Sequence, residues 1–504
     1  MLGSVDSCVL AGLDVRRVRV ECDIGRGNDP HFHLVGLAAT TVKEARERVR
    51  SAIKNSGLEY PRTRFTVNLA PAEMRKEGAA LDLPIAVAIV LALTRRQAPP
   101  HSAFLGELAL DGTVRHVDGV IVAARCLRAL GYERVFVPAD DAAEAALVDG
   151  VEVVPCPTLA AAVNHLLGVE TIAAAMGDQT AVSSPAAALE HDLAEIHGQD
   201  EARRALEVAA AGGHHLLLTG PPGAGKTMLA RCLPGILPPL DLAEALEVTQ
   251  VRSLLGELPR GRPLDWTRPF VAPHHGVSMA GLIGGGSGLA LPGEISRAHH
   301  GVLFLDELAE FQTPVLQALR QPLESGRVSI TRSGGSVTYP ARFTLIAATN
   351  PCPCGWSGDS LRACRCTPGS VDQYQRRLSG PLLDRIDLQV AVRRVPLEHL
   401  ASEPTGETSV VVRERVVAAR GRQVERQGCL NAQLKPAELR RQAGLAPPSR
   451  RALERWAAQR GLTARGFHRA WRVARTSADL DASDQIGESH VLEALGFRLQ
   501  DVAA

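Results

Sequence analysis

A glycine-rich stretch near the middle of the 504-residue chain constrains its fold more than any other feature. It reads Gly220-Pro221-Pro222-Gly223-Ala224-Gly225-Lys226-Thr227 and fits the pattern G-x-x-x-x-G-K-[ST] without a mismatch. An apolar segment at 214–219 precedes it, and a helical pattern begins at Met228. Glycines let backbone N–H groups surround an anion, and a helix N-terminus adds positive potential. The stretch therefore predicts a strand, a phosphate-binding loop and a helix in an α/β fold.

Polar side chains follow two more apolar strands. Asp306 and Glu307 come after the segment 301–305, and Asn350 comes after 343–348. Open α/β sheets bind their ligands at the carboxyl ends of parallel strands, so we expect these side chains near the phosphate loop. Taken alone, the acidic pair could be solvated and Asn350 could be a turn residue. The phosphate loop favours the functional interpretation.

These residues predict a site for ATP and Mg²⁺. Lys226 would reach the β- and γ-phosphates, while the hydroxyl of Thr227 and the carboxylate of Asp306 would hold Mg²⁺. Glu307 would polarise the attacking water, and Asn350 would orient it. The backbone of residues 220–225 would contact the phosphates as part of the same loop.

Alternating strand and helix patterns divide the chain into four parts. Residues 1–169 predict a mixed α/β domain, whose first strand covers 18–22. Residues 170–188 lack periodicity and predict a linker. A second α/β unit spans 189–395, and 396–504 predict a helical lid.

The composition excludes several classes of protein. The net charge is +1, ten cysteines are too few for a disulfide scaffold, and the longest apolar run is about half a membrane span. No signal peptide is expected at Met1–Asp6, so the predicted location is the cytoplasm, without a membrane partner. Charge is nevertheless uneven, since residues 411–475 hold 15 Arg and one Lys against four Glu, a net charge of +12. These arginines could be solvated helix faces or could meet DNA phosphates.

At this point the chain resembles the AAA+ ATPases, within them the magnesium-chelatase-like group, and most closely the ComM/YifB family. The resemblance covers nearly the whole chain. It is carried by Gly198-Gln199, Leu382-Leu383-Asp384-Arg385-Ile386-Asp387, Thr463-Ala464-Arg465-Gly466, Ala272-Pro273-His274-His275-Gly276-Val277-Ser278, Gly284-Gly285-Gly286, Pro292-Gly293-Glu294-Ile295-Ser296, Asn350-Pro351-Cys352-Pro353-Cys354-Gly355, Val67-Asn68-Leu69-Ala70-Pro71-Ala72, Lys76-Glu77-Gly78 and Asp82-Leu83-Pro84.

The resemblance implies a fold and an activity. It implies a Lon-protease-like α/β domain, an AAA+ core with a parallel sheet, and a helical lid. It also implies a hexameric ATPase, and for ComM a DNA helicase that drives branch migration during natural transformation. Arg385 would be a finger acting on the neighbouring subunit's ATP, and Arg465 the sensor arginine of the lid. The alternative is a chelatase-like remodeller of a protein or metal-insertion complex.

The N-terminal domain looks like a Lon protease without its nucleophile and base. Ala80 stands where the resemblance places Ser, and Ile121 stands where it places Lys. A Ser–Lys mechanism needs both groups, so proteolysis is not expected. Assembly or DNA handling is the expected role of this domain.

Two segments of the core are candidates for contact with single-stranded or branched DNA. The first is the Gly-rich loop 276–288, which carries Met279 and in chelatase-like proteins points into the central channel of the ring. The second is a predicted β-hairpin within 326–343, with Gly334-Gly335 as its turn. Its Arg327 and Arg332 could contact a phosphate backbone, or the hairpin could simply pack on a neighbour.

The insert 352–366 contains four cysteines. Cys352, Cys354, Cys364 and Cys366 form C-x-C-x₉-C-x-C, which predicts a tetrahedral structural Zn²⁺. Reduced thiols and disulfides are the alternatives.

Overall fold

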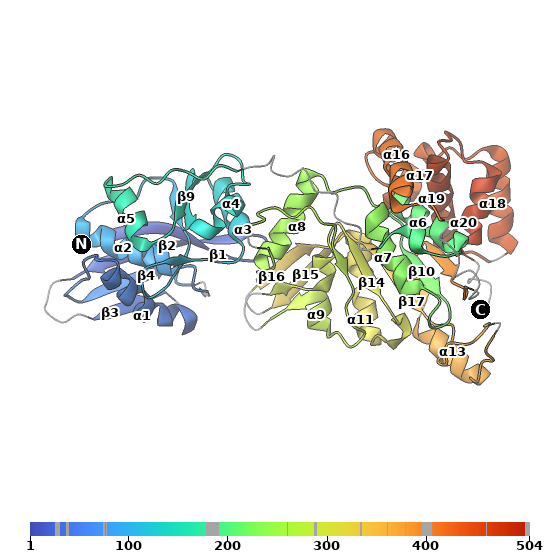
Figure 1. Cartoon of the computed structure of the whole chain (residues 1–504), viewed down its shortest axis with the longest axis horizontal. Helices are drawn as coiled ribbons and strands as arrows, with labels where there is room; N and C mark the ends of the chain where they lie inside the picture. Colours follow the sequence, from blue (N-terminus) through green and yellow to red (C-terminus); the bar gives the residue numbers. More distant parts are fainter. Residues whose placement is uncertain are drawn as a thin grey trace.

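The computed structural model describes residues 1–25, 31–36, 40–73, 76, 78–177, 191–259, 261–286, 290–332, 335–359, 361–378, 380–395, 406–459 and 461–498. It confirms a mixed α/β fold with a parallel sheet and helices. Figure 1 shows an elongated molecule, with the N-terminal sheet at one end, the central parallel sheet in the middle and the C-terminal helices at the other end.

The N-terminal part is built on a seven-stranded mixed sheet in the order β3-β4-β2-β1-β5-β8-β9. Helix α2 is apolar on all sides and buried over residues 82–92, as expected of a helix enclosed by a core. Its one acid, Asp82, is paired with Arg48 at 2.7 Å. The elements are β1 (Leu2–Leu10), β2 (Val15–Ile24), β3 (Phe32–Val35), α1 (Thr40–Asn55), β4 (Phe65–Ala70), α2 (Asp82–Thr94), β5 (Ser102–Phe104), β6 (Glu107–Leu108), β7 (Val114–Arg115), α3 (Val120–Ala129), β8 (Arg134–Pro138), α4 (Ala142–Ala145), β9 (Glu152–Cys156) and α5 (Leu159–Leu167).

The central part is a five-stranded parallel sheet in the order β11-β14-β17-β10-β18. Strands β14, β17 and β10 are apolar on both faces, which is typical of parallel strands covered by helices. The elements are α6 (Asp200–Gly212), β10 (Leu216–Thr219), α7 (Lys226–Ile236), α8 (Leu242–Leu254), β11 (Phe270–Val271), α9 (Met279–Ile283), β12 (Gly284–Gly285), β13 (Leu291–Pro292), α10 (Glu294–Arg297), β14 (Val302–Leu305), α11 (Thr313–Ala318), α12 (Arg320–Ser325), β15 (Arg327–Arg332), β16 (Gly335–Pro340), β17 (Thr344–Thr349), α13 (Pro368–Arg377), α14 (Gly380–Leu383) and β18 (Leu388–Ala391).

The C-terminal part is helical and shares a hydrophobic core with α6, α7 and one face of the central sheet. Helix α16 packs on α6 and α7, and α19 packs on α6 and α20. These helices lie beside α6 in Figure 1. They are α16 (Ser409–Gln427), α17 (Pro436–Gln442), α18 (Pro447–Gln459), α19 (Ala464–Leu480) and α20 (Glu488–Gly496).

The N-terminal sheet is attached to the core through α3, α4 and α8. Ile121, at the position where the resemblance places a Lys, is fully buried in an apolar cluster with residues of α8. Buried Glu144 accepts hydrogen bonds from Ile121 N at 3.0 Å and from Ser253 Oγ at 2.5 Å. The position of the expected catalytic Lys is therefore part of the contact between the two sheets.

The predicted linker differs from expectation where the structure describes it. Ala175 donates a backbone hydrogen bond to Val153 O at 2.8 Å, next to β9. A β-carbon on Gly177 would lie 2.0 Å from Ala146 O. Residues 170–177 are thus packed on the N-terminal sheet, whereas 178–188 lie outside the described residues.

Candidate functional site

Three adjacent parallel strands bring the predicted nucleotide residues together. Strand β10 leads into the phosphate loop, β14 ends before Asp306, and β17 ends before Asn350. The register aligns Leu305 with Ala347, and Thr219 with Thr349, so the polar residues emerge at one edge of the sheet. The structure therefore gathers residues that lie 130 positions apart in the sequence.

Lys226 lies at the centre of this edge. Its Nζ donates to Gly220 O at 2.6 Å, to Pro221 O at 3.0 Å and to Asn350 Oδ1 at 3.1 Å. Burial lowers the pKa of Lys226, and the charges of Asp306 and Glu307 oppose this shift. All three acceptors are neutral oxygens, so an anionic phosphate oxygen would bind the ammonium more strongly.

The loop itself has room for an anion. Gly223 and Gly225 adopt positive φ angles of 75° and 91°, which glycine tolerates without strain. A β-carbon added at either position would have open space around it, so the loop backbone is accessible from outside. The first helical residue of α7 is Lys226 itself. These features fit a bound triphosphate.

A pair of oxygen donors fits Mg²⁺ beside this loop. Thr227 Oγ1 donates to Asp306 Oδ2 at 3.0 Å, so the two oxygen atoms are close enough to bind the same metal ion. Hydroxyl and carboxylate oxygens are the ligands that Mg²⁺ prefers. These two residues would hold the ion, and the ion would neutralise phosphate charge when bound.

Glu307 has a neighbour that the sequence does not reveal. Its backbone is in the left-handed region, with φ 51°, which is strained for a residue other than glycine. His275 Nδ1 lies 3.2 Å from Glu307 Oε2. The next residue along the chain from His275, Gly276, starts the predicted channel loop. The repeated His274-His275 within the resemblance was the only signal that could have identified this contact.

The helix α6 lies next to the phosphate loop, as the resemblance implies. Gln199, which precedes it, donates to Ala224 O at 3.4 Å and also to Arg393 O. Gln199 has a φ of 59°. The segment Gly198-Gln199 is therefore close enough to the loop to border a bound nucleotide.

The two candidate arginines lie elsewhere. Arg385 and Arg465 both line a cavity of about 1050 Å³, together with His215, Gly301 and Thr344. These last three residues stand at the beginnings of β10, β14 and β17, whereas the nucleotide residues stand at their ends. Four-residue parallel strands span about 13 Å. The candidate catalytic set is thus divided between opposite edges of one sheet.

Acidic side chains hold both arginines in place. Arg385 pairs with Glu324, and its side chain is mostly buried. Arg465 Nη1 lies 4.0 Å from Asp384 Oδ2, one residue before Arg385, and its side chain is 69% exposed. Arg465 therefore lies near Arg385, in the same cavity, and not near Lys226 of the same chain.

The four cysteines of the insert converge. Cys352 Sγ lies 3.4 Å from Cys354 Sγ and 3.7 Å from Cys364 Sγ, and Cys354 and Cys364 are 3.6 Å apart. Candidate ligand atoms of all four, Cys366 included, lie within 4.8 Å of one another. All ten cysteines of the chain are free. Zn–S bonds of about 2.3 Å in a tetrahedron place sulfurs about 3.8 Å apart, so this donor set fits zinc.

The cysteine cluster is in contact with the phosphate loop. A β-carbon on Gly355, whose φ is 80°, would lie 2.6 Å from Pro222 Cδ. The same carbon would lie 3.9 Å from Asn350 Cγ. The turn after Cys354 therefore packs against the phosphate loop and against Asn350, the residue that follows strand β17.

The first of the two segments considered for DNA contact contains a helix where a loop was expected. The loop after Gly276 contains the short helix α9, because the Ser278 side chain caps it by accepting from Gly281 N at 3.1 Å. Met279 is 38% exposed, while Leu282 is fully buried. Residues 287 and 288 of the loop lie outside the described residues.

The hairpin is confirmed, with a corrected turn. Strands β15 and β16 pair from Arg327 with Pro340 to Arg332 with Gly335. Gly335 thus belongs to β16, so its prediction as a turn residue is wrong, and Gly334 lies outside the described residues. Arg332 stands at the tip and Arg327 at the base, so the two arginines are separated by the full strand.

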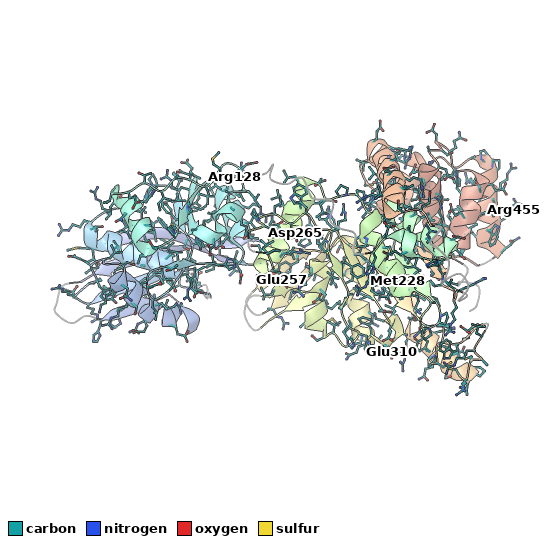
Figure 2. The ribbon with its side chains drawn as sticks, viewed as in Figure 1. Arg128, Met228, Glu257, Asp265, Glu310 and Arg455 are labelled. Atoms are coloured by element: carbon teal, nitrogen blue, oxygen red, sulfur yellow. The ribbon has the colours of Figure 1, made fainter. Side chains whose placement is uncertain are left out.

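Part of the positive charge of the lid is paired with acidic residues of the core or of the lid itself. Arg415 pairs with Glu207 of α6 at 2.6 Å, Arg426 pairs with Asp479 at 2.7 Å, and buried Arg469 lies 3.6 Å from Asp387. Other arginines of this segment point outward, such as Arg455 in Figure 2. The net charge of +12 therefore overstates the surface available to a polyanion.

Comparisons with known proteins agree with this architecture. Family models match at residues 20–141 (subunit ChlI of Mg-chelatase), 192–400 (magnesium chelatase, subunit ChlI) and 406–498 (magnesium chelatase, subunit ChlI C-terminal). The protein YifB of Escherichia coli is 43% identical over 99% of this chain and 97% of its own length. The competence protein ComM of Haemophilus influenzae is 44% identical over 99% and 97%. The magnesium-chelatase 38 kDa subunit of Cereibacter sphaeroides is 26% identical over 39% and 57%.

These matches follow the chain from the N-terminal sheet to the lid. No helix in the described ranges is both long and apolar enough to cross a membrane. The chain belongs to the ComM/YifB family of magnesium-chelatase-like AAA+ ATPases.

Proposed function

We propose that this protein is a cytoplasmic, Mg-ATP-driven motor that works on DNA as a ring of identical subunits, six in number. The observation that carries the proposal is the division of the site. Lys226, Asp306 and Glu307 lie at one edge of the central sheet, while Arg385 and Arg465 lie at the other. The two edges can be combined in one site when a second copy presents its arginines to the first.

The ATP step follows from the residues at the first edge. Backbone groups of the loop and Lys226 would bind and orient the phosphates, and Asn350 would align the water. Glu307 would accept the proton of that water. The neighbouring Arg385 and Arg465 would stabilise the charge that spreads over the oxygens of the departing phosphoryl group.

The role on DNA is supported by the relative named for competence and by two exposed groups of the core. Met279 and Arg332 are both exposed. The loop that carries Met279 begins beside His275, which contacts Glu307 of the candidate ATP site. The motor is expected to act in recombination or in DNA uptake during transformation.

The deciding experiment measures ATP turnover without DNA and with single-stranded, duplex or branched DNA. We expect binding and stimulation by at least one of these. Absence of both, with ATP turnover retained, would favour the second candidate, an ATP-driven remodeller of a protein or metal-insertion complex. The magnesium-chelatase models that match the chain favour that alternative.

His275 is expected to couple the channel loop to hydrolysis. In His275→Ala, the ratio of DNA-stimulated to unstimulated turnover should fall towards one, because Glu307 loses its contact with the residue before the loop. The KM for ATP should stay unchanged, since His275 makes no described contact with the phosphate loop. His274→Ala is the matched control, because it removes the adjacent imidazole, whose ring is tilted against that of His275 with centroids 4.0 Å apart. An unchanged ratio in His275→Ala would refute the coupling.

The purified protein is expected to contain about one zinc per chain. Cys364→Ser should lose the metal and lower ATP turnover several-fold, because the cluster packs on Pro222 through Gly355. Elemental analysis and steady-state turnover measure both effects, with Cys429→Ser as a control away from the cluster. Metal-free protein that keeps full turnover in the presence of a chelator would exclude a structural zinc.

A further inference from the structure

The hairpin β15–β16 lies against the N-terminal domain, at the boundary visible in Figure 1. A β-carbon on Gly12, in the turn between β1 and β2, would lie 2.1 Å from Val337 Cγ1 of the hairpin. Leu10 and Leu13, which flank this turn, pack on the core that contains the hairpin. The turn and the hairpin therefore form one packed unit.

Two arginines, one from each domain, lie near the tip of this unit. Arg332 and Gly335 are the last paired residues of the hairpin. A β-carbon on Gly335 would lie 3.3 Å from Arg16 Nη2, so the guanidinium of Arg16 reaches the tip. A β-carbon on Gly285 of β12 would lie 3.1 Å from Arg332 Nη2. Glycines thus leave room for both guanidinium groups beside the channel loop.

Neither guanidinium is paired with an acidic side chain among the residues that the structure describes. Arg16 and Arg332 are exposed, and neither side chain makes an ion pair or hydrogen bond within the described ranges. By contrast, Arg17 is paired with Asp6 at 3.0 Å. Two exposed like charges on elements that pack together, neither paired with an acid in the described ranges, point to an anion as their ligand.

We propose that Arg16 and Arg332 form one phosphate-contacting site, through which the N-terminal domain takes part in binding the nucleic acid backbone. This inference rests on the proposed function and extends its DNA path from the core to the N-terminal domain. Guanidinium groups bind phosphate oxygens in a bidentate manner and independently of base sequence.

The test uses the full-length protein and fluorescence anisotropy with a labelled oligonucleotide at several salt concentrations. Arg16→Ala and Arg332→Ala should each weaken binding about three- to tenfold, to a similar extent for two unrelated sequences. Each should lower the slope of log affinity against log salt concentration by about 0.7 for single strands or 0.9 for duplex. The double variant should lower the slope about twice as much.

Arg17→Ala is the matched control, since it removes the same charge from the next position of β2. Its affinity and salt slope should stay close to those of the unmodified protein. Melting temperatures of all variants show whether each one folds. If Arg16→Ala behaves like Arg17→Ala while the unmodified protein binds DNA, this inference fails and the proposed function stands. If the unmodified protein does not bind DNA, both fail.

Discussion

Replacing Glu307 with Gln is expected to lower ATP turnover about 100- to 1000-fold and to leave ATP binding intact. The amide keeps the shape of the side chain but cannot accept the proton of the attacking water. Lys226 and the loop, which would bind the phosphates, are unchanged by this substitution. The loss should therefore fall on kcat, with little change in the Kd for ATP.

The measurement combines steady-state hydrolysis with the binding of a fluorescent ATP analogue. Glu310→Gln is the matched control, because Glu310 lies one turn further on, is exposed and is visible at the surface in Figure 2. It removes the same charge and should retain turnover. Substantial hydrolysis by Glu307→Gln would remove Glu307 from the role of water activation.

Replacing Arg385 with Ala should lower ATP turnover about 1000-fold or more, whereas ATP should still bind. Arg385 lines the cavity at the beginning of the strands, far from the Lys226 of its own chain. Its loss should therefore disable the ATP site of the neighbouring copy. Arg385→Lys should restore little, since an ammonium lacks the planar fork that fits a phosphoryl group.

Mixing two inactive variants distinguishes this arrangement from a role within one chain. Lys226→Ala subunits keep Arg385, and Arg385→Ala subunits keep a complete phosphate loop. In an equal random mixture, about a quarter of the contacts between copies pair an intact loop with an intact arginine, so about that share of turnover should return. Arg377→Ala, on exposed α13, should retain full turnover. A mixture that stays inactive would contradict the role across copies.

Local patterns predicted the parts of the fold that local physics determines. Buried strands β10, β14 and β17 are short apolar runs between turn residues, and their prediction required no knowledge of distant contacts. Strand β1 was missed, although it is central in its sheet, because its alternation includes Ser and Asp residues that resemble a polar terminus. Helix α17 has only seven residues, which is too short a segment to show a clear helical period in the sequence.

The same limit applies to the candidate site. The spacing of Cys352 to Cys366 is local, and the convergence of the four sulfurs could be predicted from it. The sequence could not indicate that His275 contacts Glu307, since 32 positions and three strands separate them. It could not place Arg465 beside Asp384 either, because that position depends on how α16 and α19 pack on α6. Such placements arise from tertiary packing.

The separation of the phosphate loop from the two arginines also bears on regulation by abundance. In the proposed ring, a solitary chain would carry the phosphate loop of one ATP site and the arginines of another. Its specific activity should therefore rise steeply with protein concentration and then level off, as expected when a folded partner acts as a ligand. Dilution would switch such a motor off without any inhibitor, and expression level alone would set its threshold.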